Sequence, residues 1–134
     1  VTFTISFFVE IKIYSLLIIT ITFLLTSIMF ALAGFINAVF ARTFDDISII
    51  PNFVLLPLTY LGGMFYSIDI LPNFWRSLSS FNPIFYMMDS FRLGFLGVGS
   101  VELWKAFLVP ISMIVILALL ANALLNRGVS IKTE

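Results

Sequence analysis

Asp89 and Arg92 are the main charged side chains that interrupt the apolar part of this sequence. They lie three residues apart, a spacing that places them side by side on a helix, where they can pair. A charged side chain is costly to bury among apolar neighbours, so each of the two is by default a candidate functional residue. A salt bridge between them is the competing structural explanation, and the sequence leaves both open.

The sequence lacks the residues that enzymes most often use for acid–base, nucleophilic or metal chemistry. It has no cysteine and no histidine, so it offers neither a thiolate nor the commonest general base and metal ligand. Asp45 and Asp46 are adjacent carboxylates, which alone do not make a metal site. Gly62 and Gly63 are not followed by a lysine or a nucleotide-binding pattern. We expect no catalytic site, no metal, no cofactor and no ATP binding by this chain.

The composition is that of an integral membrane protein. The chain has 134 residues, of which 61% are hydrophobic and 10% are charged, whereas soluble domains carry about 25% charged residues. Positive and negative residues balance, so nothing indicates nucleic-acid binding. The expected surroundings are the lipid bilayer.

Three segments are expected to cross the membrane. Residues 15–40 carry no charge and exceed the length of about 20 residues that a spanning helix needs. Residues 49–68 form a second span, which we expect to be kinked and broken near residues 59–63, because a spanning helix accommodates proline and glycine only where neighbours satisfy the backbone. Its helix-breaking residues are Pro51, Pro57, Gly62 and Gly63. Residues 106–125 form the third span, and residues 1–9 are interpreted as the end of a preceding one.

The first span carries two features of helix contact. A stripe of small residues allows another helix to approach closely; it comprises Ser27, Ala31, Gly34 and Ala38. Asn37 lies near the end of the span, where a hydrogen bond to another helix is favoured over a contact with substrate.

The loop at residues 41–48 contains the spacing of a helix cap. Thr43 and Asp46 lie three residues apart before an apolar run, which is typical of a capping box. The functional alternative is a contact of Arg42, Asp45 and Asp46 with a cytosolic partner. The numbers of positive residues on the two sides are too similar to fix the orientation in the membrane.

Residues 69–100 are expected to form two short helices between the second and third spans. Asn82 followed by Pro83 favours the start of a helix, and Gly97 favours its end. One face of this helix is apolar and the opposite arc is mixed with polar residues. The apolar face comprises Ile84, Met87, Met88, Phe91 and Phe95, and the polar arc includes Tyr86, Asp89, Ser90 and Arg92. Composition favours a hairpin that re-enters the membrane and a pair of surface helices equally.

The order of these patterns resembles the C-terminal half of ABC-2 type transporter permeases. The runs that carry the resemblance are ALAGFINAVFARTFDDIS, FVLLPLTYLGGMFYS and NPIFYMMDSFRLGFLG. In that family the last run typically reads Asn-Pro, an aromatic or aliphatic pair and then an arginine, places that Pro83, Ile84, Tyr86 and Arg92 occupy here. Met64 departs from the pattern, because a smaller residue is usual at its position. The first two runs resemble in particular one group of uncharacterised bacterial exporter permeases.

The resemblance implies an all-α, six-span permease of the bacterial inner membrane, of which this chain supplies the last three spans. Residues 69–100 would then be external re-entrant helices, and residues 42–48 would face the cytosol. The family's permeases form dimers with two separate ATP-binding cassette subunits, which hydrolyse ATP.

The function implied is export of a drug, lipid or polysaccharide by alternating access. The alternative is a non-transporting membrane scaffold or assembly protein. The candidate pathway or gate residues are Thr59, Tyr60, Gly62, Gly63, Tyr66, Asn82, Pro83, Tyr86, Asp89 and Arg92. Of these, Asp89 and Arg92 are expected to hold the gate in place rather than to touch the cargo.

Overall fold

The computed structural model describes residues 13–64, 70 and 72–126, and this part of the chain is helical with no strand. The helices are α2 (Leu16–Phe40), α3 (Phe44–Ile50), the π-helical turn η1 (Pro51–Leu55), α4 (Leu56–Leu61), α5 (Asn73–Ser80), α6 (Pro83–Leu96) and α7 (Leu103–Asn126). The predicted all-α class is confirmed. The predicted segment 1–9 and Tyr66 lie outside the described residues.

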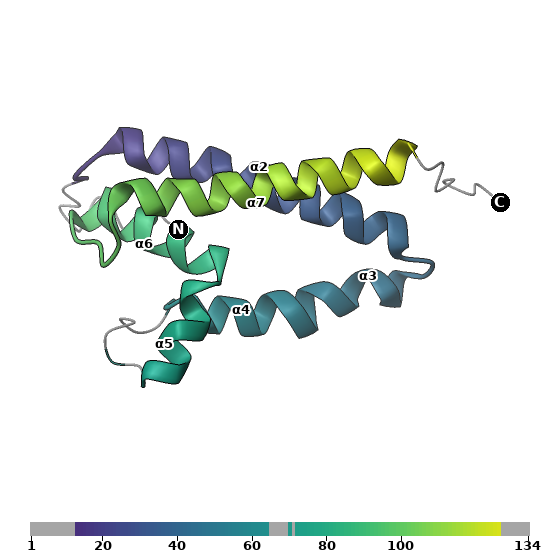
Figure 1. The fold of residues 1–134 in the computed structure, drawn as a ribbon, viewed down its shortest axis with the longest axis horizontal. Coiled ribbons are helices and arrows are strands. Elements are labelled where there is room, and N and C mark those ends of the chain that lie inside the picture. Colours follow the sequence, from purple (N-terminus) through teal and green to yellow (C-terminus); the bar gives the residue numbers. More distant parts are fainter. Residues whose placement is uncertain (1–12, 65–69, 71, 127–134) are drawn as a thin grey trace, which may run out of the picture.

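Helices α2 and α7 lie side by side and run in the same direction (Figure 1). Helix α2 begins after Ser15, whose hydroxyl accepts a hydrogen bond from the Ile18 N–H at 3.4 Å. Helix α7 begins at Leu103 and so includes Trp104 and Lys105, which the sequence placed before the span. Both helices are long and apolar enough to cross a membrane.

The third candidate span is the continuous run Phe44–Leu61, formed by α3, η1 and α4. It begins earlier than the predicted residue 49 because Thr43 caps it. Pro57 has no N–H, and its ring would clash with the Phe53 carbonyl in a regular α-helix. The wide turn η1 directly before Pro57 accommodates that ring, so the expected kink takes the form of a π-helical turn.

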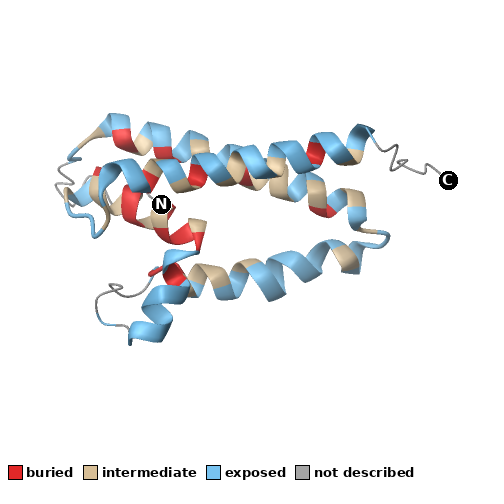
Figure 2. Ribbon diagram, in the orientation of Figure 1, coloured by how far each residue is buried: buried red, intermediate tan, exposed pale blue. Residues whose placement is uncertain are grey.

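The described helices make one packed group and one span that stands apart from it. Helices α2, α6 and α7 all contact one another, and buried positions concentrate there (Figure 2). None of the residues of Phe44–Leu61 is buried. This span reaches α2 only through α3 and reaches α6 only through α4.

Different elements lie at the two ends of the helical bundle. The turn between α2 and α3 and the end of α7 lie at one end of the molecule, and α5, α6 and the starts of α2 and α7 lie at the other (Figure 1). Helix α6 therefore lies at the end where α7 begins, opposite the turn that joins α2 to α3.

The buried side of α6 combines residues from both predicted faces, since Ile84 and Met87 of the apolar face are 6% and 3% exposed. Asp89 and Ser90, from the predicted polar arc, are buried, whereas Phe95 from the predicted apolar face is 39% exposed. In water a helix turns its apolar face inward, but lipid is itself apolar and gives no such preference. Polar groups instead turn towards protein partners, because the hydrocarbon interior offers them no hydrogen bonds.

Candidate functional site

Helix α6 has the start and the end that its sequence predicts. The Asn82 Oδ1 accepts a hydrogen bond from the Ile84 N–H at 3.0 Å, and Pro83 occupies the first turn. At the other end Gly97 adopts a φ of 72°, and its N–H donates to the Leu93 carbonyl at 2.8 Å. That left-handed conformation favours glycine. The predicted cap and stop are confirmed.

The junction between α4 and α6 consists of Leu58, Gly62, Gly63, Asn82 and Arg92. The Asn82 Nδ2 donates to the Leu58 carbonyl at 2.6 Å, and the Arg92 Nη2 donates to the Gly63 carbonyl at 3.0 Å. The Gly62 N–H donates to the Thr59 carbonyl at 3.1 Å and not to the Leu58 carbonyl, which would be its partner in a regular α-helix. The Asn82 amide therefore satisfies a carbonyl at the end of α4 that would otherwise have no partner. The arginine charge also complements the negative end of the helix dipole.

Two glycines make the close approach at this junction possible. A Cβ on Gly62 would lie 3.0 Å from Ile84 Cγ2 and 3.1 Å from the Thr59 carbonyl oxygen. Gly63 has a φ of 76°, which other residues rarely adopt. The chain can therefore turn sharply at the end of α4 while its carbonyls face α6.

Asp89 binds the backbone of the loop between α6 and α7. It is 2% exposed, and its carboxylate accepts hydrogen bonds from the Ser100 N–H at 2.9 Å and from the Val101 N–H at 3.0 Å. Neighbouring backbone N–H groups of this kind stabilise a negative charge. No ion pair joins Asp89 to Arg92 within the described part of the chain, so a salt bridge between them is not what occupies these two side chains.

On a third side, α6 contacts the start of α2. The Ser15 N–H donates to the Gly94 carbonyl at 2.9 Å. A Cβ on Gly94 would lie only 2.6 Å from Ile19 Cγ1, so the two helices meet at this glycine. Sequence reasoning missed this contact, although a glycine inside a helix costs about 1 kcal/mol relative to alanine and so indicates a packing requirement.

The remaining candidate pathway residues are distributed over different places. The Thr59 hydroxyl donates to the Leu55 carbonyl of its own helix at 2.7 Å, and Tyr60 is 52% exposed. The Tyr86 hydroxyl donates to the Ser80 carbonyl at 2.8 Å, at the turn between α5 and α6. The structure thus brings together Thr59, both glycines, Asn82, Pro83 and Arg92, while Asp89 and Tyr86 serve other contacts of α6.

The candidate cytosolic loop lies at the opposite end and forms the predicted capping box. The Asp46 carboxylate accepts hydrogen bonds from the backbone N–H groups of Arg42 and Thr43, both at 3.0 Å, and the Thr43 hydroxyl accepts from the Asp46 N–H at 3.3 Å. Asp45 is exposed in the first turn. Asn37 donates to the Ile47 carbonyl at 2.9 Å, which confirms its predicted interhelical hydrogen bond.

Comparison with known proteins gives one consistent result. The ABC-2 type transporter family model matches residues 1–96. The chain is similar to the inner membrane transport permease YadH of Escherichia coli K12 and to that of Shigella flexneri, with 51% identity over 122 residues in each case. The alignments cover 91% of this chain and 48% of each permease, so the chain spans about half the length of these curated relatives. No solved structure gives a match.

Proposed function

This chain belongs to the ABC-2 type transporter family and is a multi-pass protein of the bacterial inner membrane, and from that premise we propose that it works as the distal half of an exporter permease. In this proposal, α6 connects the span α3–η1–α4 to the pair α2 and α7, and movement between these two groups opens or closes the outer end of the pathway.

The observation that carries the proposal is the way in which α6 is bound on three sides. Its Asn82 and Arg92 hold the end of α4, its Asp89 holds the loop before α7, and its Gly94 carbonyl accepts from Ser15 at the start of α2. Within the described residues, α4 itself contacts neither α2 nor α7, and the span that contains it reaches α2 only at its far end, through α3. A displacement of α4 must therefore either carry α6 along or break the junction.

The hydrogen bonds of the junction are few enough to break during a movement, and their partners are defined well enough for the same bonds to form again. A neutral hydrogen bond contributes about 1 kcal/mol and one to a charged group about 1.5–3 kcal/mol, so the two bonds of Asn82 and Arg92 together contribute a few kcal/mol. The π-helical turn η1 in the middle of the same span supplies a bend point, because such turns interrupt the regular α-helical hydrogen bonds and are a known cause of kinks. Rearrangement of this span needs no unfolding of the α2–α6–α7 group.

We propose that the energy for this movement comes from separate ATP-binding cassette subunits and that the complete permease acts as a homodimer. The substrate is a drug, lipid or polysaccharide, and no described residue selects among these classes. In this arrangement the turn between α5 and α6 re-enters the membrane, because Asn82 reaches a carbonyl before the last residue of α4. Thr59 and Tyr60 would line the route beside it.

The direct test reconstitutes the complete permease in liposomes with its ATP-binding subunit and measures ATP hydrolysis. We expect binding of the subunit and a change in its hydrolysis rate when the permease is present. A subunit that neither binds nor responds would contradict the proposal and favour a scaffold or assembly protein.

A topology measurement supplies a second test. Cysteines placed at Arg42, in the turn before α3, and at Ser100 of the complete protein should react with an impermeant reagent from opposite sides of the membrane. Reaction from the same side would contradict the three-span arrangement. Replacement of Ser112, inside α7, serves as the control that should resist labelling from either side.

A further inference from the structure

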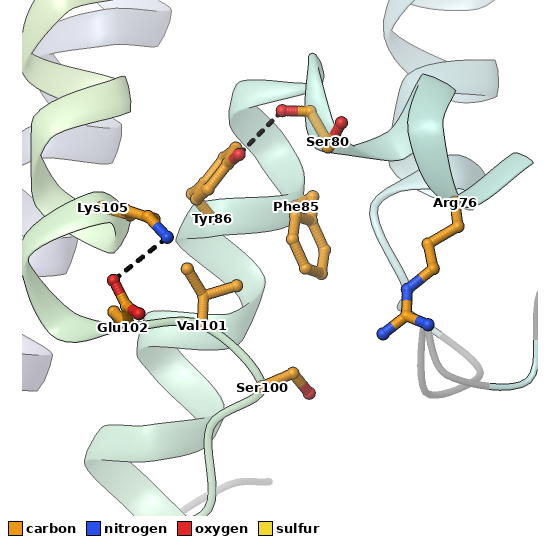
Figure 3. Close-up of a pocket in the computed structure, with 8 residues that line it drawn as sticks. All are labelled: Arg76, Ser80, Phe85, Tyr86, Ser100, Val101, Glu102 and Lys105. Carbon is orange, nitrogen blue, oxygen red and sulfur yellow. Dashed lines mark hydrogen bonds and ion pairs between the residues drawn. The ribbon is translucent and has the colours of Figure 1, made fainter. Parts of the chain in front are cut away.

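A polar pocket lies between α5, α6 and the start of α7, away from the α4–α6 junction. Its volume is about 260 Å³. The lining residues are Arg76, Ser80, Phe85, Tyr86, Ser100, Val101, Glu102 and Lys105. Figure 3 shows Lys105 and Glu102 on one wall and Arg76 on the opposite wall, with Phe85 and Val101 between them. The pocket therefore has an apolar floor and charged sides.

The charge of the pocket favours an anion. Two cationic side chains and one carboxylate line it. Glu102 is already bound, since Lys105 Nζ lies 3.0 Å from its Oε2 and the Trp104 Nε1 donates to the same oxygen at 2.7 Å. The hydrogen bond from Lys105, and then that from Trp104, lower the pKa of Glu102. The ion pair compensates the charges of Lys105 and Glu102 alike, so the net positive charge of the pocket is that of Arg76, while Lys105 keeps further N–H donors for a ligand. A guanidinium has five N–H donors, so Arg76 can hold a partner within the chain and a phosphate at once.

The residues beside the pocket favour a place near the lipid headgroups. It adjoins the first turn of the candidate span α7, where Trp104 is 60% exposed, and Trp75 of α5 is 44% exposed. Tryptophans are enriched at the boundary between the hydrocarbon and the headgroups. Phe81, which follows the pocket residue Ser80, is 83% exposed. A ligand whose head enters the pocket can therefore place an apolar tail against exposed apolar surface.

We propose that this pocket binds the phosphate headgroup of an anionic phospholipid in the outer leaflet of the membrane. Arg76 and Lys105 contact the phosphate, and the hydroxyls of Ser80, Tyr86 and Ser100 line the space around it. The bound lipid links α5 to α7 and so restrains α6 on the side away from α4. This assignment concerns binding alone and does not depend on the transport reaction proposed above.

The test measures lipids retained by the complete permease after purification from nanodiscs, by native mass spectrometry. The nanodiscs contain phosphatidylglycerol and phosphatidylcholine in equal amounts. The wild-type protein should retain phosphatidylglycerol preferentially. R76Q/K105Q should retain at least about tenfold less, because the loss of one charge-assisted contact alone accounts for about that factor and this variant removes two. R42Q removes one positive charge at the opposite end of the spans, and its retention should equal that of the wild type.

A variant that should increase lipid retention distinguishes an effect on the pocket from a loss of retention caused by misfolding. E102Q removes the only carboxylate among the eight pocket residues and should raise the retention of phosphatidylglycerol. Equal retention of both lipids by the wild-type protein, or unchanged retention in both pocket variants, would overturn the proposal. Displacement of the lipid by sn-glycerol 3-phosphate would also overturn it, because the site would then bind a free phosphate ester without needing the acyl chains.

Discussion

Helix α2 and the span α3–η1–α4 are both long enough to cross a membrane, but they are held in the molecule in different ways. Helix α2 buries side chains along its length, from Ile18 and Thr22 to Met29 and Asn37. The span Phe44–Leu61 buries none and is held at its two ends. Asn37 binds it at one end, and Asn82 and Arg92 bind it at the other.

We expect this difference to separate a fixed part from an adjustable part of the same chain. Packing along a helix spreads its stability over many contacts, whereas a span held by side-chain bonds at its ends depends on a few. Helix α6 belongs to both parts, since it packs against α2 and α7 and also holds the end of α4. Substitutions on its two sides should therefore have different consequences.

The largest loss of stability is expected for Asp89→Ala, on the fixed side. It leaves the N–H groups of Ser100 and Val101 without their acceptor and opens a small cavity. We expect the free energy of unfolding of the complete permease in mixed micelles to fall by about 3 kcal/mol. Asp45→Ala, an exposed acidic position, should change it little. Equal effects of the two substitutions would remove the distinction between the fixed side and the rest.

A smaller loss is expected for Gly94→Ala, where α6 meets α2. The new Cβ would lie 2.6 Å from Ile19 Cγ1, so the helices must separate, at a cost of about 1–3 kcal/mol in the same unfolding measurement. Gly34→Ala is the matched control, because no atom lies within 4 Å of its Cβ. It should be neutral or stabilise by about 0.5–1 kcal/mol. Destabilisation by Gly34→Ala would show that the small-residue stripe of α2 is covered in the assembled protein.

On the adjustable side, Asn82→Ala should change the arrangement more than the stability. It removes a cap and the bond to Leu58, each worth about 1 kcal/mol, at a total cost of about 2 kcal/mol. Spin labels at Leu56 and Phe95, both exposed, should show a broader distribution of distances because α4 is no longer held to α6. Asn122→Ala, an exposed asparagine of α7, should leave the distribution unchanged. An unchanged distribution in Asn82→Ala would contradict the role of the junction.

The smallest effect concerns the exposed pair Glu102 and Lys105 at the start of α7. Because Lys105 and then Trp104 lower the pKa of Glu102, the pair is intact above the ordinary glutamate pKa. It is lost as the pH falls through the lowered value. The fluorescence of Trp104, measured with Trp75→Phe, should shift in that acidic range. The same protein with E102Q should show no such shift, and a shift that persists in E102Q would assign it to another group.

Local patterns in the sequence predicted the elements of both regions and most of their ends. The caps at Thr43, Asp46 and Asn82, the stop at Gly97 and the irregular second span depend on neighbouring residues alone. The Asn37 bond was also predicted, because an amide near the end of an apolar span needs a polar partner. The proline-associated turn was predicted as a kink, although its π-helical form was not.

The contacts of α6 could not be predicted in the same way. Arg92 binds the carbonyl of Gly63, Asp89 binds the backbone at Ser100, and Gly94 meets Ile19. The spacing of Asp89 and Arg92 suggested a pair, but each side chain found backbone groups on a different neighbouring element. The rule that oppositely charged residues three apart on a helix can pair does not take account of backbone groups on other elements, which compete for the same side chains.

Three apolar spans, the caps of the helices and the likeness to a transporter family can all be recognised in the amino-acid sequence. Those features follow from composition and from hydrogen bonds between residues a few positions apart. The burial of Asp89 and Ser90 and the partners of the polar residues of α6 became visible only in the folded protein. In an apolar surrounding the choice of these partners depends on where unsatisfied backbone groups of distant segments lie, and the folded arrangement alone brings them together.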